Sequence, residues 1–148
     1  MVHTFLLEPG VWQGNGTLLF KGTPEKWPIF IRWEIHKGAP LLIDALLTID
    51  ISSLSTVHHY RYKIIPGEDE KKFQIRLQNE VIGNLEGKGI IDQKYIAWDF
   101  HDPKLPYEGL ERYLLLENGG YRIASEFCST DQTRLQITGE IHQKTALD

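Results

Sequence analysis

Gly10-Val11-Trp12-Gln13-Gly14-Asn15-Gly16 opens a series of short segments in which apolar and polar residues alternate. Glycine lets a strand bend sharply and lets a neighbouring backbone approach closely. A large ring framed by glycines at the head of such a series is typical of a core side chain that fills one end of a barrel. The stretch therefore predicts an all-β chain in which Trp12 is buried near one closed end of a barrel.

Turn-forming residues recur about every ten residues and divide the rest of the chain into similar segments. Within 71–78, for example, Phe73, Ile75 and Leu77 alternate with polar side chains. The pattern predicts strands over 11–20, 28–37, 41–50, 56–65, 71–78, 81–87, 94–100, 107–117, 120–128 and 133–143. Because the intervening loops are short, an antiparallel up-and-down β-barrel of about ten strands is favoured over a Greek-key sandwich.

The composition is typical of one globular domain over residues 1–148. Of the 148 residues, 41% are hydrophobic and 24% charged, which allows a continuous core. The net charge of −4 gives no basic surface for nucleic acid. The single cysteine, Cys128, fits a reducing compartment, and we find neither a signal peptide nor the roughly 20 apolar residues of a membrane helix. We expect a cytoplasmic protein that binds neither nucleic acid nor membranes.

The opening stretch also resembles a known signature. Gly10-Val11-Trp12 is similar to the Gly-x-Trp motif on the first strand of lipocalins and other calycin barrels. With Gly14 and Gly16 added, it resembles the opening of the nitrobindins, which are ten-stranded calycin barrels. The resemblance implies a calycin-like barrel whose interior holds a small ligand, and some nitrobindins bind haem there.

The nitrobindin resemblance raises the question of whether a residue of the last predicted strand could ligate haem iron. Nitrobindins ligate haem iron through a histidine of that strand, and Arg134 takes its position here. A guanidinium group has no lone pair for iron. His142 has the polar parity of the same strand and should point outward, unless the register slips. We therefore expect no haem cofactor, and the lipocalin resemblance implies that Arg134 instead covers Trp12.

Aromatic side chains recur on the apolar faces of successive predicted strands, where they would line a cavity or fill it. The predicted ligand-binding wall consists of Trp33, Tyr60, Tyr62, Trp98, Phe100, Tyr113 and Phe127. The predicted barrel-end set consists of Gly10, Trp12, Gly14, Gly16 and Arg134. No metal site is predicted, because adjacent His58 and His59 point to opposite faces of a strand and cannot chelate one ion together.

Charged residues of the predicted strands are a weaker candidate. A polar cluster inside the barrel would suit proton transfer or carboxylate binding, although charges of outward parity are usually solvated. Its potential members are Glu34, Asp44, Glu111, Glu126, Arg32, Arg112 and Arg122.

Three classes of function remain open. The first is a non-enzymatic protein that binds a small, mostly apolar molecule inside the barrel. The second is an isomerase-, cyclase- or lyase-type enzyme on the same barrel. The third is a partner-binding module or homodimer, to which 41–47, apolar on both faces, would contribute. We favour the first class, because the spacing of acidic, histidine and tyrosine residues defines no convergent acid–base set.

Overall fold

The computed structural model describes residues 3–38, 41–102, 104, 107–129 and 133–145. Ten antiparallel strands and one short 3-10 helix make up this part of the chain. They are β1 (Gly10–Phe20), β2 (Lys26–Lys37), β3 (Ile43–Ile51), η1 (Ser52–Leu54), β4 (Thr56–Pro66), β5 (Lys72–Asn79), β6 (Gly83–Ile91), β7 (Tyr95–Phe100), β8 (Tyr107–Leu115), β9 (Tyr121–Ser129) and β10 (Arg134–Gln143). The all-β prediction is confirmed, with strand ends shifted by a few residues.

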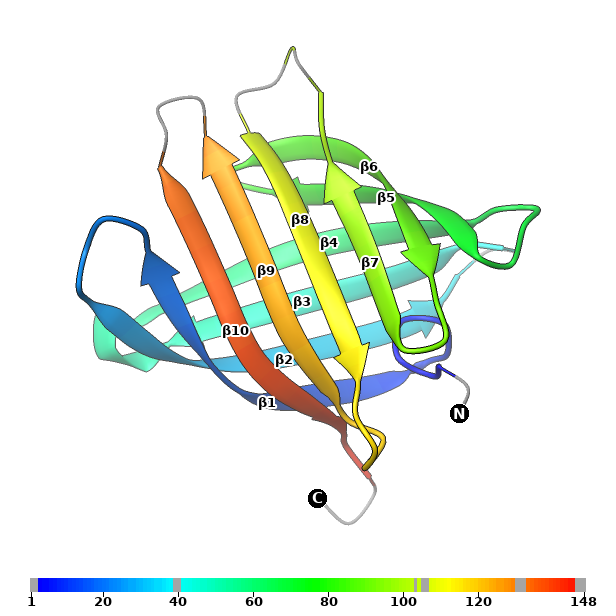
Figure 1. The fold of residues 1–148 in the computed structure, drawn as a ribbon, viewed down its shortest axis with the longest axis horizontal. Coiled ribbons are helices and arrows are strands. Elements are labelled where there is room, and N and C mark those ends of the chain that lie inside the picture. The colour runs from blue at the N-terminus through cyan, green and yellow to red at the C-terminus, as the bar shows by residue number, and fades with distance from the viewer. Residues whose placement is uncertain (1–2, 39–40, 103, 105–106, 130–132, 146–148) are drawn as a thin grey trace.

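The strands close into an up-and-down barrel. Each strand pairs with its neighbours in sequence, and β1 also pairs with β10 (Figure 1). Along β3, buried Ile43, Ala45 and Leu47 alternate with half-buried Asp44 and Leu46. The outward face of 41–47 thus carries Leu42 and Leu46 beside Asp44, and that this face contacts a partner stays a prediction.

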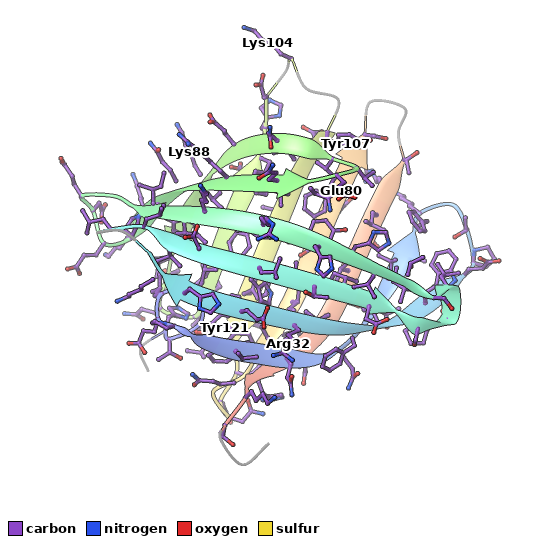
Figure 2. All side chains as sticks on the ribbon, turned by 180° about the vertical axis from the view of Figure 1, so that it is seen from behind. Arg32, Glu80, Lys88, Lys104, Tyr107 and Tyr121 are labelled. Carbon is purple, nitrogen blue, oxygen red and sulfur yellow. The ribbon has the colours of Figure 1, made fainter. Side chains whose placement is uncertain are left out.

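The barrel has a closed end, where β1 begins, and an open end, where β1 finishes. Residues 3–8 precede β1, and the side chains of Phe5 and Leu6 in this segment are completely buried. The ring centroid of Phe5 lies 5.6 Å from that of Trp12 and 5.2 Å from that of Tyr121. Figure 2 shows Tyr107 and Tyr121 toward opposite ends of the barrel. Trp12 itself is only 2% exposed, so the end that it occupies is filled.

The glycines of the opening stretch have a physical role in closing the barrel. A Cβ atom on Gly14 would lie 1.8 Å from the backbone oxygen of Glu140, and one on Gly16 would lie 2.3 Å from that of Thr138. No side chain fits at either position unless the backbone shifts. The glycines thus let β1 bend close against β10 (Figure 1).

The expectation that Arg134 covers Trp12 is wrong. In the register of β1 and β10, Trp12 lies opposite Gln143, whereas the other end of β1 reaches Leu135. Arg134 therefore lies at the open end, far along the strand from Trp12. Its side chain points outward and forms an ion pair of 3.3 Å with Glu126. The N-terminal segment, and not a basic residue of β10, packs on Trp12.

Candidate ligand-binding site

A pocket of about 370 Å³ lies inside the open end of the barrel. Its volume falls in the lower part of the range of small-molecule sites. Most of its wall is hydrocarbon, to which the inward faces of β1, β3 and β10 contribute. These apolar residues include Leu18, Phe20, Ile49, Ile51, Leu135 and Ile137. This side of the pocket is therefore apolar and suited to an apolar molecule.

The polar part of the pocket is a row on β4. Thr56, His58 and Tyr60 share the inward face of this strand and all line the pocket. Thr56 Oγ1 is buried and has no hydrogen-bond partner within the described ranges. Neither the His58 ring nor the Tyr60 hydroxyl makes a hydrogen bond to the part of the chain that the structure describes. The row therefore offers unpaired polar groups to a ligand.

Tyr60 lies at the inner end of this row. Burial raises the pKa of its hydroxyl to about 12, and the negative charge of Glu111 adds to the effect. The hydroxyl therefore stays protonated at neutral pH and can donate a hydrogen bond.

A buried carboxyl group lies deeper in the barrel than Tyr60. Glu111 on β8 is 2% exposed and accepts hydrogen bonds from Tyr62 Oη at 2.8 Å, Trp98 Nε1 at 2.6 Å and Ser125 Oγ at 3.1 Å. Burial raises the pKa of Glu111, while its three hydrogen bonds partly oppose that shift. Glu111, Tyr62, Trp98 and Ser125 form what is referred to below as the glutamate cluster.

Aromatic rings fill the barrel between the glutamate cluster and the closed end. Trp33 Nε1 donates to the hydroxyl of Tyr113 at 3.1 Å, and Tyr113 stacks on Trp98 with ring centroids 5.2 Å apart. Burial is the largest cause that raises the pKa of Tyr62 and of Tyr113 well above the ordinary value. This half of the interior is packed core, and its hydroxyl groups stay neutral.

Only part of the predicted aromatic wall lines the pocket. Tyr60 and Phe127 line the pocket. The other five rings are at most 1% exposed and do not line this pocket: they are Trp33, Tyr62, Trp98, Phe100 and Tyr113. Alternation correctly indicates that these side chains point inward, but it does not give their depth along the barrel axis. That any of the seven residues binds a ligand stays a prediction.

The glutamate cluster was only partly recognised from sequence. Among the seven charged candidates, Glu111 alone is buried, whereas the others are half-buried or exposed on the outer face. Two of them form an outer ion pair of 3.4 Å, Arg32 with Glu34. The signal that identifies Glu111 is its parity, because it is two residues before the inward-facing Tyr113 on the same strand.

The histidines do not assemble a metal site in the described ranges, where no group of three or more His, Cys, Asp or Glu side chains could hold an ion. His58 lines the pocket, while His59 lies on the opposite face of β4, 3.3 Å from the hydroxyl of Thr48. His142 is exposed, as its parity predicted. Arg134 also points outward, and the absence of a haem cofactor stays a prediction.

The fold and pocket define a small β-barrel in which the strands form a closed ring and the interior is accessible at one end. No family model matches the chain, and no curated protein shows significant sequence similarity to it. Among solved structures, the crystal structure of Rv2717c from M. tuberculosis is similar, with a TM-score of 0.68 and 8% sequence identity. The match covers 93% of this chain and 92% of that chain. At such low identity the likeness shows the barrel fold alone. In the described residues, no helix is long and apolar enough to span a membrane.

Proposed function

We propose that this protein binds one small, mostly apolar molecule in the pocket at the open end of the barrel. The observation that carries the proposal is an apolar pocket of about 370 Å³ with a row of unpaired polar groups on β4. Each 100 Å² of apolar ligand surface removed from water contributes about 2.5 kcal/mol to binding. The polar row would orient the ligand, as a few polar groups do in most small-molecule sites.

A binding role is favoured over catalysis by the position of the acidic group. Glu111 is the buried carboxyl group that an isomerase- or lyase-type mechanism would use as a base. It does not line the pocket, and its carboxyl group already accepts three hydrogen bonds. A ligand in the pocket would contact Tyr60 and Phe127 instead.

The test is titration of the full chain with N-phenyl-1-naphthylamine, a neutral apolar fluorescent probe. We expect one saturable site per protein molecule. Leu135→Trp fills the pocket from a half-buried position near its mouth and should abolish saturable binding. Thr138→Trp, on the exposed face of the same strand, is the matched control and should bind as the wild type does.

Two results would contradict the proposal. One is the absence of saturable binding by the wild-type protein. The other is unchanged probe affinity in Leu135→Trp, provided that its unfolding transition shows a folded protein.

A further inference from the structure

We infer that the pocket selects an uncharged ligand whose inner end carries a hydrogen-bond acceptor, such as a ketone or aldehyde oxygen, and that it rejects a carboxylate there. This inference rests on the proposed function and specifies its ligand class. It follows from the contrast between Tyr60, which lines the pocket, and Glu111, which lies behind it.

The hydroxyl groups of Tyr60 and Tyr62 follow one another on the inward face of β4. The hydroxyl of Tyr62 donates to Glu111 at 2.8 Å and is therefore occupied. The hydroxyl of Tyr60 makes no hydrogen bond to the described residues. Burial and the charge of Glu111 keep it protonated, so it presents a donor to the inner end of the pocket. A ligand oxygen that accepts this hydrogen bond would satisfy a group that apolar ligands leave unpaired.

No cation in the described part of the chain pairs with the carboxyl group behind this donor. All three hydrogen bonds to Glu111 come from neutral donors, and none of the ion pairs in the described part of the chain includes it. These three donors favour the ionised form of Glu111 and partly oppose the effect of burial, which raises its pKa. At a pH where Glu111 is ionised, its charge would repel a second carboxylate at the inner end of the pocket, because the interior screens charges poorly. A neutral acceptor would not meet that repulsion.

The experiment compares two ligands of matched chain length, 2-decanone and decanoate, as competitors of N-phenyl-1-naphthylamine at pH 8. We expect the ketone to bind the wild-type protein about tenfold more tightly or better. Glu111→Gln should improve decanoate binding and so reduce the ratio of the affinity for 2-decanone to that for decanoate. Glu108→Gln, an exposed position on the same strand, is the control and should leave the ratio unchanged.

A second variant tests the donor. Tyr60→Phe should weaken ketone binding by about threefold to tenfold, which is the effect of losing one ordinary hydrogen bond. It should leave the affinity for the probe itself nearly unchanged, because the ring that lines the pocket is kept.

The outcomes separate this inference from the proposed function. Equal affinities of the wild-type protein for 2-decanone and decanoate overturn the inference while leaving the binding function in place. Unchanged ketone affinity in Tyr60→Phe also overturns it. Failure of the wild type to bind the probe and both competitors overturns the proposed function itself. If Glu111→Gln does not fold, the wild-type ratio and the Tyr60→Phe result decide.

Discussion

Replacing Glu111 by glutamine should make the free energy of unfolding less dependent on pH. Burial raises the pKa of Glu111 in the folded protein above its value in the unfolded chain, so the folded state holds this proton more tightly. Such a group contributes stability that is complete below the unfolded pKa and is lost as pH rises through the folded pKa. The wild type should lose stability as the pH rises through this window, which runs from the unfolded to the folded pKa of Glu111. The glutamine variant has no proton to release there.

The magnitude follows from the release of one proton. Between the unfolded and folded pKa values, Glu111 should lower the free energy of unfolding by up to about 1.4 kcal/mol per pH unit. Below the window, the protonated acid and the amide are both neutral. The difference in the free energy of unfolding between wild type and variant should therefore not change with pH. Hydrogen bonds from Tyr62, Trp98 and Ser125 oppose the shift, but burial is the larger effect and sets the sign.

The assay is urea unfolding followed by tryptophan fluorescence, from about pH 4 to about pH 9. The difference in the free energy of unfolding, variant minus wild type, should rise with pH within the window and then level off. Glu108→Gln on the same strand is the control: its carboxylate is exposed, and its 2.9 Å contact with His101 is a surface pair of small energy. A difference that is constant over the whole pH range, or one that falls with pH, would refute the reasoning.

Three further predictions concern the closed end, Arg134 and haem. Phe5→Ala and Trp12→Ala should each cost about 3–5 kcal/mol of stability by urea unfolding, and because the two rings touch, the double variant should cost less than the sum. Arg134→Ala should cost less than about 1 kcal/mol, because its ion pair is on the surface; a loss comparable to that of Trp12→Ala would contradict the register of β10. Hemin titration should give no sharp Soret band, because Arg134 and His142 point outward. A stoichiometric band that disappears in His58→Ala would show that the pocket ligates haem from β4.

The strands and their order were predictable because alternation and turn residues are local signals. An antiparallel barrel with short loops leaves little choice of pairing, so strand order follows directly from sequence order. The burial of Trp12 follows for a similar reason, since Gly14 and Gly16 permit an approach of β10 that other residues would block. The sequence signals for these features are each contained in a residue and its immediate neighbours.

What was not predictable depends on position along the barrel axis. The parity of Arg134 indicates an outward side chain, but only the register with β1 shows that it lies at the end opposite Trp12. Phe5 was missed for another reason, because it precedes the first strand and no periodic pattern includes it. Glu111 has the same inward parity as Tyr113, but its charge alone favours a solvated position. Its burial depends on three hydrogen-bond donors that come from other strands.

The pocket exists because the inward side chains change in size along the barrel. Toward the closed end they are mostly large rings that meet across the interior, whereas at the open end β1, β3 and β10 contribute Leu and Ile side chains that leave space. The glutamate cluster lies where the packed half begins. Its hydrogen bonds fix Tyr62 and Trp98, so these rings cannot shift toward the mouth and fill the space. A site whose inner end is already rigid loses little conformational entropy on binding. Since Tyr60 and Glu111 lie at that rigid inner end, the proposed selection of a neutral over an anionic ligand would be made there and not at the mouth.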